Sequence, residues 1–211
     1  MINCLVEENK LPEVKDLEEI NIKVLIDELN KKLNDKCNEY LNTIKASSDW
    51  NEFEIDSINE LLSNNISKAP GIYFFEINFK ETLSDFTNKE KLVNFINDEF
   101  SENSEGCCPK INKERAKKHN IKEFTSNNWI SFYIGKSGNL EERLEQHLLG
   151  YGHEKTYKLN LKNNKSSIFK KCKFRFKFIE ETELKEKEYY WVIVKIEEHL
   201  RESLNPICGK Q

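Results

Sequence analysis

Glycine and proline are scarce in this chain, with seven and four residues among 211. This scarcity argues against a linker-rich chain and against an all-β fold. No apolar run approaches the roughly 20 residues that a membrane-spanning helix needs, so we expect no association with a membrane. The first residues, MINCLVEENKLPE, also lack the basic start and the long apolar middle of a signal peptide.

The six cysteines form no CxxC pair, and no histidine lies at zinc-finger spacing from them. Cys107 and Cys108 are adjacent, but this arrangement matches no zinc pattern. We therefore expect reduced thiols and a cytoplasmic location, because disulfides persist mainly in oxidising compartments.

The net charge is −4, but acidic and basic residues are unevenly distributed along the chain. Residues 1–68 carry eight Lys/Arg against fifteen Asp/Glu, whereas residues 128–211 carry sixteen against twelve. Within 153–178 there are nine basic residues and one acidic residue. A polyanionic partner therefore fits the C-terminal third of the chain, and a solvated lysine-rich face is the alternative.

Helical periodicity recurs along the chain. Apolar residues every three or four positions predict a long amphipathic helix over 16–44 and a second, shorter helix at about 56–62. The same spacing predicts helices over 88–100 and 184–204. The polar segment 101–128 is expected to be a mobile excursion.

Two aromatic and β-branched segments, GIYFFEINF (71–79) and WISFYIG (129–135), predict buried strands. KCKFRFKFI (171–179) alternates strictly, which predicts a third strand with one packed face and one face of cations. The cations are Lys173, Arg175 and Lys177.

A helix over 140–149 is predicted after the second strand. Asn139 is a good N-cap, and Glu142 three residues later completes a capping-box pattern. A stripe of leucines would face the core, and Arg143 and His147 would lie one turn apart in a second stripe beside it.

These segments together resemble the GIY-YIG nuclease superfamily. The match comprises GIY at 71–73, YIG at 133–135, and then Lys136, Ser137, Asn139, Leu140, Arg143 and His147. The family's glutamate lies some nine residues before a proline, which gives Glu197, with Glu198 next to it. Gly209 stands where the family commonly has an asparagine that braces the site.

The resemblance implies an α+β fold with a small GIY-YIG-like sheet of about three strands flanked by helices. The nuclease domain would occupy 69–211, with an insertion at about 81–127 between the first two strands. Residues 1–68 would form a helical N-terminal extension.

The resemblance also implies five catalytic residues: Tyr73, Tyr133, Arg143, His147 and Glu197. Glu197 would be the metal ligand, and the cofactor would be one Mg²⁺ (or Mn²⁺) per active site. Arg143 would hold a phosphate oxygen, and the two tyrosines would share the nucleophilic water. Either a tyrosine or His147 would be the general base.

DNA, double-stranded or branched, is the partner implied. The residues expected to contact it are Lys136, Lys155, Lys158, Lys173, Arg175 and Lys177. The expected function is a metal-dependent DNA endonuclease, of restriction type because the chain is compact. The alternatives are a structure-specific nuclease of repair or recombination and a catalytically silent domain that binds nucleic acid or protein. A restriction role on a palindrome would suggest a homodimer, with the helix over 16–44 as the candidate contact.

Overall fold

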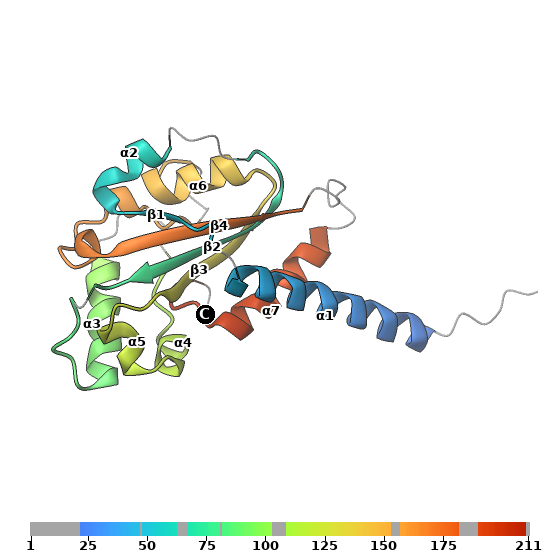
Figure 1. Cartoon of the computed structure of the whole chain (residues 1–211), viewed down its shortest axis with the longest axis horizontal. Coiled ribbons are helices and arrows are strands. Elements are labelled where there is room, and N and C mark those ends of the chain that lie inside the picture. Colours follow the sequence, from blue (N-terminus) through green and yellow to red (C-terminus); the bar gives the residue numbers. More distant parts are fainter. Residues whose placement is uncertain are drawn as a thin grey trace, which may run out of the picture.

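A four-stranded antiparallel sheet organises the described part of the molecule (Figure 1). The computed structural model of the chain describes residues 22–46, 48–62, 67–80, 82–102, 109–152, 157–181 and 190–209. The strands are β1 (Asn51–Phe53), β2 (Gly71–Asn78), β3 (Ile130–Ser137) and β4 (Lys173–Glu180), in the order β1-β4-β2-β3. The α+β class is confirmed, but the expected sheet of about three strands is wrong by one strand.

The additional strand, β1, comes from the segment that the sequence assigned to the N-terminal extension. It pairs with β4, and Phe53 lies opposite Phe174 with their rings stacked at 5.7 Å. β1 has only three residues, of which one is buried, so no alternation could reveal it. A separate extension over 1–68 stays a prediction, but residues 51–53 belong to the sheet.

Two long helices cover one face of the sheet (Figure 1). They are α1 (Ile22–Ala46) and α7 (Tyr190–Leu204). α1 overlaps the expected helix over 16–44 and continues two residues past it, and α7 lies within the expected helix over 184–204. Cys37, Tyr40 and Ile44 of α1 pack with Ile196 of α7 and with Ile72 of β2. Apolar side chains in the first turns of α1 remain about half exposed, among them Leu25 at 52% and Leu29 at 45%.

The larger part of the core lies on the opposite face. It is covered by α6 (Leu140–Leu149), α3 (Lys89–Glu102), the short α2 (Ile58–Leu61) and the 3₁₀ segments Ile55–Ser57, Leu161–Asn163 and Phe169–Lys171. The predicted leucine stripe of α6 is buried there. Aromatic rings dominate this core because alternate residues of β2, β3 and β4 point toward it.

Residues 109–128, expected to belong to a mobile excursion, contain two helices instead. They are α4 (Lys113–Lys118) and α5 (Ile121–Thr125). Asn112 and Asn120 cap their N-termini, each accepting a backbone N–H with its side-chain oxygen. The expectation failed because these helices are too short to produce a visible apolar period.

Three cysteines in the described residues, Cys37, Cys172 and Cys208, are buried free thiols, as expected. Cys107 and Cys108 lie outside these residues. No helix in the part of the chain that the structure describes is long and apolar enough to cross a membrane.

Candidate active site

The pairing of β2 with β3 brings the two tyrosine motifs together. Tyr73 is the register partner of Gly135, and the rings of Tyr73 and Tyr133 stack with centroids 6.1 Å apart. A Cβ atom at Gly135 would lie 2.1 Å from the Tyr73 hydroxyl oxygen. Glycine at this position therefore leaves the space that the Tyr73 side chain occupies.

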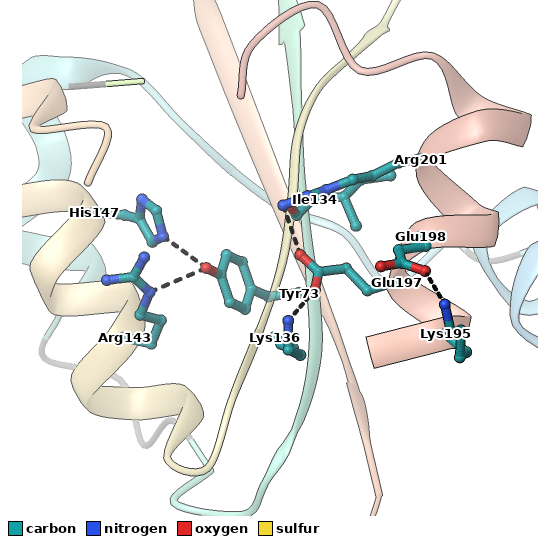
Figure 2. A network of polar contacts seen from close by, with 9 residues as sticks. All are labelled: Tyr73, Ile134, Lys136, Arg143, His147, Lys195, Glu197, Glu198 and Arg201. Carbon is teal, nitrogen blue, oxygen red and sulfur yellow. Dashed lines mark hydrogen bonds and ion pairs between the residues drawn. The ribbon is translucent and has the colours of Figure 1, made fainter. Parts of the chain in front are cut away.

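The Tyr73 hydroxyl meets both functional side chains of α6 (Figure 2). Arg143 Nε donates to it over 3.0 Å, and His147 Nε2 lies 2.9 Å from it. The two residues are one helical turn apart, so they approach the same oxygen from one helix face. Asn139 caps this helix by accepting from the backbone N–H of Glu142, as the sequence predicted.

The protonation of His147 follows from its second contact. Its Nδ1 lies 3.0 Å from the backbone nitrogen of Leu159, which can only donate. The ring is fully buried, and burial together with the charge of Arg143 lowers the pKa of His147 well below its usual value. His147 is therefore neutral, with its proton on Nε2, and donates it to Tyr73.

Both phenols of the site stay protonated at neutral pH. Burial raises the pKa of Tyr73 well above its usual value, although the positive charge of Arg143 opposes the shift. Burial also raises the pKa of Tyr133.

Burial alone would lower the pKa of Arg143, but the two phenolic oxygens raise it above its usual value, so the guanidinium remains charged. The guanidinium also donates to the side chain of Gln146 at 2.7 Å and to the backbone carbonyl of Tyr157 at 2.5 Å.

Glu197 forms a second cluster, on α7 across the sheet from α6 (Figure 2). Only 4% of the residue is exposed, and its two carboxylate oxygens are taken by two cations. Lys136 Nζ bonds one oxygen, and Arg201 Nη2 lies 2.6 Å from the other. The neighbouring Glu198 is exposed and pairs with Lys195 at 2.8 Å.

Arg201 is a site residue that the sequence reasoning missed. Its Nε and Nη2 atoms also donate to the Ile134 carbonyl, at 3.3 and 3.0 Å. Arg201 therefore ties Glu197 to the strand that carries Tyr133. The available signal was its position four residues after Glu197, on the same face of the helix.

A pocket of about 690 Å³ opens where these elements meet. Its lining includes Tyr133, Lys136, Glu197 and Arg201, together with Lys110 from the predicted insertion. Lys136 also lines a neighbouring pocket with Arg143. Lys136 therefore lies between the Arg143 side and the Glu197 side of the candidate site.

The other residues expected to bind DNA occupy varied positions. Lys173 is exposed, whereas Lys158 is buried and donates to the Gly152 carbonyl at 3.3 Å. Lys155 lies outside the described residues. The alternation of β4 was predicted correctly, since Phe174 and Phe176 are buried.

Two cations of β4 are already paired. Arg175 Nη2 lies 2.5 Å from a carboxylate oxygen of Glu76, and its guanidinium packs against the rings of Trp50 and Trp129. Lys177 Nζ lies 2.7 Å from Asp49 and is buried. The expected open row of cations is therefore reduced to Lys173 at one end of the strand.

Within the described residues, no group of three or more His, Cys, Asp or Glu side chains could hold a metal ion. Glu197 offers one buried carboxylate at a pocket. Mg²⁺ commonly binds through one or two carboxylates, with water and substrate phosphates completing its shell. One carboxylate can therefore serve such a site, but both oxygens of Glu197 are here bonded to Lys136 and Arg201.

Comparison with known families identifies the class of domain. Residues 118–200 match the GIY-YIG catalytic domain, which confirms the resemblance of this segment to the GIY-YIG nuclease superfamily. The matched segment contains Tyr133, Arg143, His147 and Glu197. Gly71–Tyr73 lies before it, but the β2–β3 pairing places this motif beside the matched residues. Comparisons with curated proteins and with solved structures found no match.

Proposed function

We propose that this protein is a divalent-metal-dependent endonuclease that hydrolyses phosphodiester bonds in DNA. The single observation that carries the proposal is the convergence of Arg143 and His147 on the Tyr73 hydroxyl. A buried glutamate beside a lysine at an adjoining pocket supports it. The family match adds the expectation of a nuclease and of a DNA substrate.

Arg143 and Lys136 are the proposed ligands of the reacting phosphate. The Arg143 guanidinium remains charged and can present paired N–H donors to non-bridging oxygens. To do so it would exchange its contact with the Tyr157 carbonyl for a phosphate oxygen. Lys136 would similarly divide its hydrogen bonds between Glu197 and the substrate.

Glu197 is the proposed metal ligand. A divalent cation bound there would acidify a water molecule and offset charge on the phosphate oxygens. Arg201 would hold the Glu197 carboxylate in position from one side. With both carboxylate oxygens already bonded to cations, Lys136 or Arg201 must give up part of its contact when a cation binds.

We propose that the tyrosines orient the attacking water and that His147 does not act as the base. His147 holds Tyr73 through Nε2, and its other nitrogen already accepts from Leu159. Tyr73 and Tyr133 have raised pKa values, so neither is a phenolate in the state described. As neutral hydroxyl groups they can still donate a hydrogen bond to a water molecule or a phosphate oxygen. Tyr133 could do so from the pocket wall, and the buried Tyr73 only if the site opens to admit the substrate.

Cleavage assays test the proposal directly. Plasmid, linear and branched DNA would be incubated with Mg²⁺ or Mn²⁺ and with wild type, Glu197→Gln, Arg143→Gln and Glu198→Gln. We expect cutting by the wild type, a loss of at least about 100-fold in the first two variants, and near-normal cutting by Glu198→Gln. Intact DNA with every protein and substrate would refute the proposal and favour a silent binding domain.

A restriction-type role in the cytoplasm is the more specific form of the proposal. Discrete fragments from unbranched DNA would support this role, whereas cutting confined to branched DNA would assign the protein to repair or recombination. Cutting both strands of a palindrome with one site per chain favours a symmetric dimer.

The exposed start of α1 is the proposed dimer contact, with a second copy of this chain as its occupant. An antiparallel pair of α1 helices centred on Leu29 would place Leu25 opposite Leu33. The same alignment sets Lys23 opposite Asp35, and Asp27 opposite Lys31. A two-fold axis through this pair thus brings apolar residues opposite apolar residues and basic residues opposite acidic ones.

A further inference from the structure

The segment that follows α7 is paired with residues of the predicted insertion. Asn112 N donates to the Ile207 carbonyl over 2.7 Å, and Gly209 N donates to the Lys110 carbonyl over 3.1 Å. An antiparallel bridge between Ile111 and Cys208 lies between these two bonds. Residues 109–112 lie outside the segment that matches the family, yet this backbone pairing attaches them to the candidate site.

Gly209 permits this attachment. Its φ of +124° is a conformation that L side chains rarely adopt, and a Cβ atom there would lie 3.4 Å from the Tyr133 ring. Any larger residue would therefore strain the backbone, although its Cβ atom would make only an ordinary contact with Tyr133. At the position where the family commonly has an asparagine, this chain has a glycine that pairs with the insertion.

The pairing places Pro109 and Lys110 in the wall of the pocket that contains Glu197. The Lys110 side chain is exposed, and among the described residues its amine makes no hydrogen bond or ion pair. The two other cations of this wall, Lys136 and Arg201, are both bonded to Glu197. Within the described part of the chain, Lys110 is thus the cation of this pocket wall that is not bonded to another side chain; it is called the uncommitted cation below.

We propose that Lys110 binds a backbone phosphate of the DNA at this pocket, which makes the insertion part of the substrate-binding surface. The inference rests on the proposed nuclease function. Glu197 and Glu198 both line the pocket and would repel a polyanion. An uncommitted ammonium group beside them offsets this repulsion without disturbing the cations that hold Glu197.

A binding experiment without cleavage tests the proposal. Full-length wild type, Lys110→Ala, Lys110→Arg and Lys118→Ala would be titrated against two unrelated labelled duplexes in EDTA. Lys118 is a matched control because it is an exposed lysine of the same insertion that does not line the pocket. Fluorescence anisotropy at several salt concentrations gives the dissociation constant and its salt dependence.

We expect Lys110→Ala to raise the dissociation constant about fivefold for both duplexes and to reduce the salt slope by about one. Lys110→Arg and Lys118→Ala should stay within about twofold of wild type. A Lys110→Ala variant that binds like Lys118→Ala would overturn the proposal. Far-ultraviolet circular dichroism checks that each variant is folded.

The outcomes also separate this proposal from the nuclease function. If the wild type cuts DNA and Lys110→Ala binds like the control, only the role of Lys110 fails. If the wild type binds DNA, shows the expected Lys110 effect and cuts nothing, the nuclease function fails and the phosphate contact stands. A wild type that neither binds DNA in EDTA nor cuts it with Mg²⁺ or Mn²⁺ would overturn both.

Discussion

The backbone nitrogen of Leu159 lies 3.0 Å from Nδ1 of His147, and this contact determines what the histidine can do. A backbone N–H only donates, so Nδ1 accepts and the proton of the neutral ring is on Nε2. Nε2 in turn lies 2.9 Å from the Tyr73 hydroxyl. His147 is therefore placed to orient Tyr73. The sequence left open whether a tyrosine or His147 is the general base, and this contact argues against His147.

The buried His147 should make stability depend on pH. Its pKa is lowered in the folded state, so below the ordinary value of about 6.5 the unfolded chain binds a proton that the folded chain does not. The free energy of unfolding is thus expected to fall as pH decreases below about 6.5, by at most about 1.4 kcal/mol per pH unit from this group. Urea denaturation at a series of pH values measures this slope.

His147→Gln provides the control for that slope. A glutamine can accept from Leu159 with its oxygen and donate to Tyr73 with its nitrogen, and it does not titrate. We expect the pH dependence of the variant to be shallower between about pH 5 and 6.5. Equal slopes in the two proteins would show that His147 is not held neutral.

A methyl group at Gly135 should disable the site selectively. Its Cβ atom would lie 2.1 Å from the Tyr73 hydroxyl, so Gly135→Ala must displace the ring that anchors Arg143 and His147. We expect cleavage to fall at least about 100-fold. Gly138→Ala is the matched control, because no atom lies within 4 Å of its added Cβ. Similar activity in the two variants, measured by plasmid cleavage, would contradict the proposed role of Tyr73.

Local features of the sequence were sufficient to predict α6. The Asn139 cap starts the helix, and Gly150 ends it at a φ of +79°, so the predicted range of 140–149 is the observed one. The sequence also placed Arg143 and His147 on one face. It could not show that both bond the same hydroxyl, because Tyr73 lies 70 residues before Arg143 and the contact depends on the tertiary fold.

The cations of β4 show the same limit. Alternation predicted the face on which Arg175 and Lys177 lie, but not what covers that face. Their partners, Glu76 and Asp49, lie 99 and 128 residues away in the chain. A strand whose charged face is paired within the fold has the same sequence pattern as one whose charged face is open to DNA.

Loss of Arg201 should slow DNA cleavage and raise the Mg²⁺ concentration that cleavage requires. Arg201 fixes Glu197 against the Ile134 carbonyl, and removal of such a supporting group typically costs about 10- to 100-fold in metal affinity or activity. Arg201→Met is therefore expected to cut DNA more slowly and to need more Mg²⁺ for half-maximal activity. A titration of cleavage rate against Mg²⁺ concentration measures both effects.

Lys195→Met is the control for Arg201→Met. Lys195 is a cation of the same helix, but it is exposed and pairs with Glu198 instead of Glu197. Its loss should leave the half-maximal Mg²⁺ concentration within about twofold of wild type, because an exposed pair contributes little. An Arg201→Met variant with the same Mg²⁺ dependence as wild type would exclude a positioning role for Arg201.

Self-association through the start of α1 can be tested with a single charge. Leu29 lies at the centre of the proposed antiparallel pair, so Leu29→Asp would place two carboxylates together across the two-fold axis and remove apolar contact. Sedimentation of the wild type at tens of micromolar should give twice the 25.0 kDa of one chain, and the variant should sediment as a monomer. Asn42→Asp adds the same charge at an exposed position near the other end of α1 and should remain dimeric.

Because each chain carries its own Tyr73, Arg143 and Glu197, the monomeric variant should still nick one strand while losing paired cuts on a palindrome. A wild type that sediments as a monomer would contradict this contact without affecting the assignment of the catalytic residues.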